Sequence, residues 1–403
     1  MARNDLSPSS AHISTALHGD GLVALQYRAQ AGGETADTIS SISHADVMRL
    51  ERKGNVFTMS AATKGGLMQE TSMEFSGLND EIYLGMFICS HNADVIEKAI
   101  FSNVRFVKPA GDDFVRYEKY LGSNLEIMNV ETGDRKILHQ ARYSIQAPNW
   151  STDGQSLIYN SEGLLYKYEL DSGKIVLLDT DFADENNNDH VISFDGTQMA
   201  ISHHDEETDG ASLIYTLPIE GGTPKKITPK GPSYLHGWSA DDKKLVYCAE
   251  RNGQYDVYQI DIASQNETQL TDEPGLDDGP EYTPDGKYIY FNSNRTGTMQ
   301  IWRMHPDGSN PEQLTTDEFN DWFAHISPDG KRMVYISYPP SVDSGDHPYY
   351  KRVMLRISSI DGGQPQVIAY LYGGQGTMNV PSWSPDSKYI AFVSNSGHLS
   401  EEK

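Results

Sequence analysis

Apolar and polar residues alternate along most of this chain, in short runs that are separated by turn residues. One clear example is 287–291 (KYIYF), which follows the turn Pro284-Asp285-Gly286 and precedes the polar turn 294–297. A period of two is typical of β-strands with one buried face, and Pro, Asp and Gly favour tight turns between them. The pattern therefore predicts an all-β protein.

A short motif recurs within this pattern: an aromatic or apolar residue, Ser or Thr, any residue, Asp, and usually Gly. Subtraction of successive Asp positions gives spacings of 42, 46, 44, 44 and 57 residues. A period of about 40–45 residues is typical of four-stranded propeller blades. The six aspartates of the repeat are Asp153, Asp195, Asp241, Asp285, Asp329 and Asp386.

The two ends of the repeat region complement each other. The run 124–128 has the pattern of an outer strand with no inner pair before it, and 389–393 has the pattern of an inner strand with no outer pair after it. Joining them makes one blade from both chain ends and removes open sheet edges. We therefore predict a six-bladed β-propeller over 115–396. The long last spacing predicts insertions at 338–351 and 372–378, as loops at blade edges.

Residues 1–107 lack the repeat but contain alternating runs that also predict strands. The few strands and the abrupt start predict a small N-terminal β-sandwich that is only partial. The predicted strands lie at 22–28, 47–52, 56–60, 82–88 and 99–106.

The Pro-Asp-Gly turns over 115–396 resemble those of the TolB-type propellers, a family with WD-like repeats. TolB itself is a periplasmic component of the Tol–Pal envelope system, and it carries an α/β domain where this chain has an all-β segment. The resemblance implies a periplasmic or secreted protein, without implying the Tol–Pal role. Residues 11–106 resemble the later strands of concanavalin-like sandwiches, which accompany secreted bacterial proteins that handle glycans. A weaker likeness of fold to oligogalacturonate lyases implies metal-assisted carbohydrate cleavage as an alternative.

The net charge of the chain limits the classes of partner that it can bind. Asp and Glu total 57 against 32 Lys and Arg, a formal net charge of −25. The resulting field repels phosphate, which excludes nucleic acid and anionic membrane surfaces. We expect no membrane insertion, because no run of about 18 apolar residues occurs. The first residues lack the apolar core of a signal peptide, so either the protein is cytoplasmic or the chain lacks its natural start.

The repeat also reveals positions that depart from it. Five residues before each motif Asp stand Pro, His, His, Pro, Ala and Pro, so small apolar residues satisfy the fold there and the two histidines need another reason. Imidazole suits a divalent cation and general acid–base work. We predict that His190 and His236 lie at the channel mouth, and that they are the candidate ligands of one divalent cation. The full predicted site is His190, His236, Asp278, Asp321, Trp322, His325, Gln375 and Asn379.

Three functions fit these observations. The first is a binding or scaffold propeller of the envelope that engages a glycan or protein at the channel mouth. The second is a carbohydrate-active enzyme such as a metal-assisted lyase. The third is a TolB-like protein-interaction module without a small ligand. The first two predict that the polar rim converges in space, whereas the third allows its side chains to pack against each other.

Overall fold

The computed structural model describes residues 1–397 and divides the chain into two compact units, Met1–Ser102 and a second that starts at Asn103. Strands and turns make up almost all of the described chain, which confirms the all-β prediction. The exception is one 3-10 helix, η1 (Glu206–Thr208). Within 1–397, no helix has the length and apolar character that a membrane span requires.

The first unit contains two antiparallel sheets, of strand order β4-β3-β2-β1-β8 and β5-β6-β7. Ile13 and Leu25 from one sheet and Phe57 and Met59 from the other are fully buried in one core cluster. The strands of this unit are β1 (Ala2–Arg3), β2 (His12–Leu17), β3 (Leu22–Arg28), β4 (Ala36–Ser43), β5 (Val47–Lys53), β6 (Val56–Ala62), β7 (Gln69–Glu74) and β8 (Tyr83–Leu84).

Two predicted strands of this unit were wrong. Only Tyr83–Leu84 of the run 82–88 is a strand, and it pairs with the two residues of β1. The run 99–106 forms no strand, and Ile100 in it is 97 % exposed. A strand needs a neighbour to satisfy its backbone, and no adjacent strand pairs with this run in the described chain. The concanavalin-like assignment stays a prediction.

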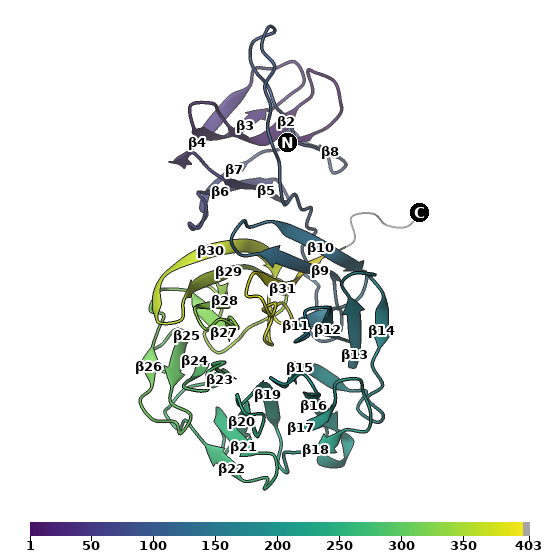
Figure 1. The fold of residues 1–403 in the computed structure, drawn as a ribbon. Helices are drawn as coiled ribbons and strands as arrows, with labels where there is room; N and C mark the ends of the chain where they lie inside the picture. Colours follow the sequence, from purple (N-terminus) through teal and green to yellow (C-terminus); the bar gives the residue numbers. More distant parts are fainter. Residues whose placement is uncertain (398–403) are drawn as a thin grey trace. The chain divides into compact units, whose positions relative to one another are not determined.

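The second unit contains five four-stranded antiparallel sheets and one three-stranded sheet. Figure 1 shows them arranged in a ring, with one strand of each sheet toward the centre and the later strands outside it. This arrangement is that of a β-propeller. The four-stranded sheets are β11 (Gln146–Trp150), β12 (Ser156–Ser161), β13 (Leu164–Glu169) and β14 (Ile175–Leu177); β15 (Asn186–Ile192), β16 (Gln198–Asp205), β17 (Ala211–Pro218) and β18 (Lys225–Lys226); β19 (Ser233–Trp238), β20 (Lys244–Arg251), β21 (Gln254–Asp261) and β22 (Glu267–Gln269); β23 (Asp277–Tyr282), β24 (Ile289–Ser293), β25 (Gln300–Met304) and β26 (Glu312–Gln313); and β27 (Asn320–Ile326), β28 (Arg332–Tyr338), β29 (Lys351–Ser359) and β30 (Gly362–Gly373).

The three-stranded sheet joins the two ends of this unit. It contains β9 (Gly122–Asn129), β10 (Arg135–Ala141) and β31 (Tyr389–Ser396), and β31 pairs with β9 from Tyr389↔Asn129 to Ser396↔Gly122. A bridge between Trp383 and Ile390 extends the sheet toward the centre. The predicted pairing of 124–128 with 389–393 therefore forms.

The repeated motif makes the same hydrogen-bonded turn in every copy. In the first copy the Ser151 hydroxyl donates to Asp153 at 2.6 Å, and the Ser156 amide donates to Ser151 Oγ at 2.9 Å. The Ser or Thr hydroxyl thus fixes the turn that links the first strand of a sheet to its second. The same hydroxyl-to-Asp bond occurs at Ser193–Asp195, Ser239–Asp241, Thr283–Asp285, Ser327–Asp329 and Ser384–Asp386.

These turns define two ends of the ring. In an antiparallel four-stranded sheet, the turns after the first and third strands lie at one end, which we call the turn end. The turn after the second strand and the connection into the next sheet lie at the opposite end, which we call the mouth end.

Candidate functional site

Each first strand of the four-stranded sheets has a register shift close to the positions that the repeat singled out. The shifts lie between Gln146 and Asn149 in β11, between Asp278 and Glu281 in β23, and between Trp322 and His325 in β27. β15 and β19 have shifts in the same region. A bulge turns side chains out of the regular alternation, and this explains how neighbouring residues of one strand reach different surroundings.

His236 and Asp278 form the ion pair at the middle of the site. His236 Nε2 lies 3.0 Å from Asp278 Oδ1, and the Gly279 amide donates to the same carboxylate oxygen at 2.7 Å. The His236 ring also stacks on Phe323, with 5.6 Å between ring centroids. These two residues of the predicted site belong to separate sheets and are in contact.

The electrostatics of the pair follow from burial and from each partner's charge. Burial acts to lower the pKa of His236, but the charge and hydrogen bond of Asp278 outweigh it and leave the pKa raised. Burial acts to raise the pKa of Asp278, but His236, then His347, lower that pKa to about 2. The structure therefore favours an imidazolium–carboxylate pair in a buried place.

Four further side chains form hydrogen bonds beside this pair. Asn379 Nδ2 donates to Gln375 Oε1 at 3.0 Å, and His347 Nδ1 donates to the same oxygen at 2.5 Å. Gln375 Nε2 donates in turn to Asn188 Oδ1 at 3.4 Å, which connects the loop after β30 to β15. The predicted neighbours Gln375 and Asn379 are therefore in contact.

Sequence reasoning missed His347 and Asp189. His347 lies in the insertion that was expected to be a loop at a blade edge, yet its ring packs on Trp322 at 4.4 Å and on Phe323 at 5.2 Å. An insertion after the second strand of a sheet projects at the mouth end, and this was the available signal. Asp189 is buried, and that burial raises its pKa to about 7, against a lowering by His236.

Three predicted residues have partners elsewhere. His190 is fully buried, and its Nε2 bonds at 3.2 Å to the carbonyl of Ile158 on β12, in the neighbouring sheet. Asp321 accepts from Arg356 and from Ser337, which lie within its own sheet. His325 pairs with Glu281 at 2.6 Å.

The expected metal site lacks a ligand set. In residues 1–397, no group of three or more His, Cys, Asp or Glu side chains could hold a metal ion. His190 and His236 have the separate partners given above, and burial lowers the pKa of His190 to about 4. The described side chains thus supply no site for the predicted divalent cation.

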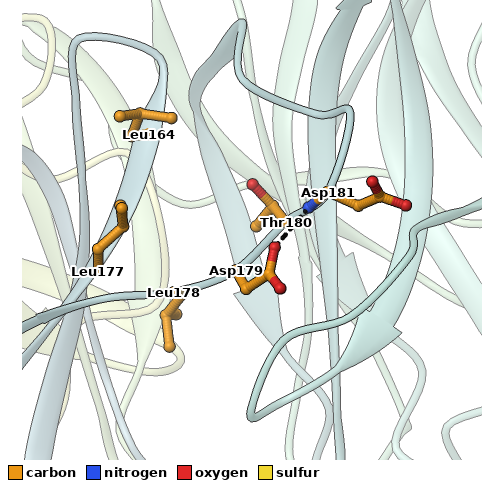
Figure 2. Close-up of a pocket in the computed structure, with 6 residues that line it drawn as sticks. All are labelled: Leu164, Leu177, Leu178, Asp179, Thr180 and Asp181. Carbon is orange, nitrogen blue, oxygen red and sulfur yellow. Dashed lines mark hydrogen bonds between the residues drawn. The ribbon is translucent and has the colours of Figure 1, made fainter.

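A pocket of about 240 Å³ lies away from this network, on the outer strands of one sheet. Figure 2 shows Leu164 and Leu177 on neighbouring strands, with Asp181 directed away from them. Its other lining residues are Leu178, Asp179 and Thr180.

Known proteins share this propeller. The uncharacterized protein Atu1656 of Agrobacterium fabrum is 47 % identical over 272 residues, which cover 67 % of this chain and 92 % of that protein. A solved structure from Agrobacterium tumefaciens, provisionally named TolB, is 46 % identical over 69 % of this chain and 99 % of its own, with a TM-score of 0.66. Residues 236–343 match the model of the TolB beta propeller domain. The chain belongs to the TolB-like β-propeller family.

Two TolB proteins are less similar to this chain in sequence and match a smaller part of it. The Tol-Pal system protein TolB of Francisella tularensis is 26 % identical over 156 residues, so the chain spans about a third of that relative, 35 % of its length. The TolB structure from Acinetobacter baumannii has a TM-score of 0.50 at 18 % identity, covering 63 % of this chain and 64 % of that one. The latter likeness shows the TolB-like fold alone.

Proposed function

We propose that this chain is a six-bladed protein-interaction propeller of the bacterial envelope, which binds a partner protein at its mouth end and catalyses no reaction. The six sheets are its six blades, and the sheet of β9, β10 and β31 is the blade that closes the ring. The envelope location rests on the TolB-like family and on the distant Tol–Pal relatives.

One observation carries this proposal: the polar side chains at the centre bond to one another. His236 with Asp278, and His347 with Gln375 and Asn379, form a network in which His236 and Asn379 are at least nine-tenths buried. A catalytic or sugar-binding site needs polar groups that are open to a substrate. Side chains that pack against each other fit the third of the functions that the sequence allowed.

Site-specific photocrosslinking in the source bacterium tests the proposal. A photoreactive residue is placed at Asp272 or Asp343, which are exposed at the mouth end, and at Asp171 or Asp307, which are exposed at the turn end. We expect a discrete protein adduct from the mouth positions and none from the turn positions. Equal adducts from both ends, or no protein adduct together with a thermal shift on addition of oligosaccharides, would refute the proposal.

A further inference from the structure

The insertion after β28 lies at the mouth end and reaches the first strands of three sheets. Residues 339–350 contain no helix or strand, and they contact the innermost strands of three sheets. His347 packs on β27 and faces Asp278 of β23, and the Tyr349 hydroxyl donates to Gln146 of β11 at 3.1 Å. Two side chains of the insertion, His347 and Tyr349, therefore contact the first strands of three different sheets.

His347 occupies a place with aromatic walls and a carboxylate. Trp322 meets the imidazole edge to face, with an interplanar angle of 63° and 4.4 Å between centroids, and Phe323 does so at 78° and 5.2 Å. Asp278 Oδ2 lies 4.0 Å from His347 Nε2, and Gln375 Oε1 accepts from His347 Nδ1. We call Trp322, Phe323, Asp278 and Gln375 the aromatic–carboxylate cage.

A neutral imidazole satisfies only part of this cage. His347 Nδ1 donates to Gln375, so a neutral ring has no proton on Nε2 to offer to Asp278. Burial lowers the pKa of His347, although Asp278 acts to raise it, and the ring is therefore neutral near pH 7. His236 already pairs with Asp278 Oδ1, so a cation in the place of His347 would meet the other carboxylate oxygen, Oδ2, together with the two aromatic rings.

Lifting of the insertion would break exposed and partly buried contacts, among the latter a hydrogen bond from Asn320 Nδ2 to the Val342 carbonyl at 2.9 Å and one from the Leu121 amide to the Tyr350 hydroxyl at 3.0 Å. The ion pair between Asp346 and Arg116 joins two side chains that are 41 % and 45 % exposed, so solvent screens their attraction. Three prolines and a glycine interrupt the segment, at Pro339, Pro340, Gly345 and Pro348. The larger contacts are the aromatic ones of His347, Tyr349 and Tyr350.

We propose that His347 is an internal substitute for a partner, and that the aromatic–carboxylate cage receives a Lys or Arg side chain of a partner protein when residues 339–350 lift. This inference rests on the proposed function, because it names the chemistry by which the mouth end recognises its partner. It also agrees with the net charge of −25, which attracts basic surfaces.

The test uses the full chain with His347→Ala, which empties the cage. The probes are n-butylammonium and methylguanidinium, which represent Lys and Arg side chains, with 1-pentanol as the neutral control. Calorimetry should show that both cations bind to His347→Ala with dissociation constants of ~1–10 mM. They should bind more weakly, or not at all, to the parent. The alcohol should bind to neither protein. At tenfold excess over the dissociation constant, the cations should raise the melting temperature by about 2 °C.

Two further variants complete the test. His305→Ala removes an imidazole that stacks on Tyr288 at 5.2 Å and has no ion pair to a carboxylate in the described chain, so it should gain no cation binding. Gln375→Leu in the His347→Ala background should weaken binding severalfold, and Asp278→Asn should abolish it if that variant folds. Equal binding of alcohol and cations, or no binding by a folded His347→Ala variant, would overturn the cage.

The outcome separates this inference from the proposed function. If His347→Ala binds cations and also raises the yield of the mouth adduct at Asp272, the result supports both the aromatic–carboxylate cage and the proposed protein-interaction function. If it binds cations but the mouth gives no protein adduct, the protein-interaction function fails, and the partner assigned to the cage fails with it. If the mouth adduct forms but His347→Ala binds no cation, the cage alone is wrong.

Discussion

The turn end and the mouth end of the propeller use the same six repeats differently. At the turn end every copy makes the same bond between a hydroxyl and an Asp, and in four copies a Lys two residues after the Asp lies within 4 Å of its carboxylate. At the mouth end, seven residues before the motif Asp, the copies carry Gln, Asn, Tyr, Asp, Trp and Asn. The difference teaches that the constant positions specify the fold, whereas the variable ones are not constrained by it, and it is at these that we propose the partner is recognised.

Both ends depend on closure of the ring, so its loss should have the largest effect. Deleting the residues after Pro381 removes β31, whose Ile390, Phe392 and Val393 are buried, and exposes the edge of β9. We expect the second unit to lose its cooperative thermal transition in circular dichroism. Phe392→Ala is the milder control and should cost about 3–5 kcal/mol. A deletion variant that melts like the parent would contradict the role of this strand in closure.

The second prediction concerns a buried ion pair on the mouth side. Arg356 bonds to Asp317 and to Asp321, and Asp321 is fully buried. Arg356→Met leaves the Asp321 carboxylate without its cation, which should lower the free energy of unfolding by about 3–5 kcal/mol in urea titrations. Adding Asp321→Leu to that variant should recover part of the loss. If Arg356→Met is as stable as the parent, the ion pair between Arg356 and Asp321 does not make this contribution to the free energy of unfolding.

The third prediction is a pH dependence of stability that comes from His190 and lies between pH 7 and pH 5. Burial holds the pKa of His190 at about 4 in the folded chain, below its ordinary 6.5. Between these values the unfolded chain binds a proton that the folded chain does not, so stability is complete above pH 6.5 and falls as the pH drops toward 4. Between pH 7 and pH 5 the loss from this group should be about 2 kcal/mol.

His190→Gln keeps a donor for the Ile158 carbonyl and removes the titration. Its free energy of unfolding, measured in urea at pH 7 and pH 5, should therefore fall by about 2 kcal/mol less than that of the parent. The same decrease in both proteins would show that His190 does not titrate in this range.

Substitutions within a single turn should have the smallest effects on the free energy of unfolding. Ser239→Ala removes the hydroxyl that donates to Asp241 and accepts from the Lys244 amide, and should cost about 1 kcal/mol. Lys243→Ala breaks only the exposed pair with Asp241 in the same turn, and should change stability by less than about 0.5 kcal/mol. Equal costs for the two changes would show that the charge pair, and not the hydroxyl, holds the turn.

The same contrast explains what could be predicted from sequence. The turns and the pairing of both chain ends were predictable, because their bonds join residues that are close in sequence or related by a fixed period. Repeat register singled out both His236 and Asp278, but it made His190 the partner of His236 and did not predict the His236–Asp278 ion pair. Asp321 and His325 were misplaced because their partners, Arg356 and Glu281, lie on other strands and carry no periodic signal. His347 lies in an irregular insertion, whose path no alternation predicts.

The central claim, that the mouth end binds the partner, is tested most directly by reversing charge at either end. One variant carries Glu207→Lys, Glu273→Lys and Glu318→Lys at the mouth end, and the matched variant carries Lys at the exposed turn-end positions Glu131, Asp171 and Glu220. Both change the net charge equally, and each carries the photoreactive residue at Asp272. The mouth variant should lose about tenfold or more of the adduct while its melting temperature stays that of the turn variant, which should keep the adduct. An adduct that survives in the mouth variant and disappears in the turn variant would contradict the account.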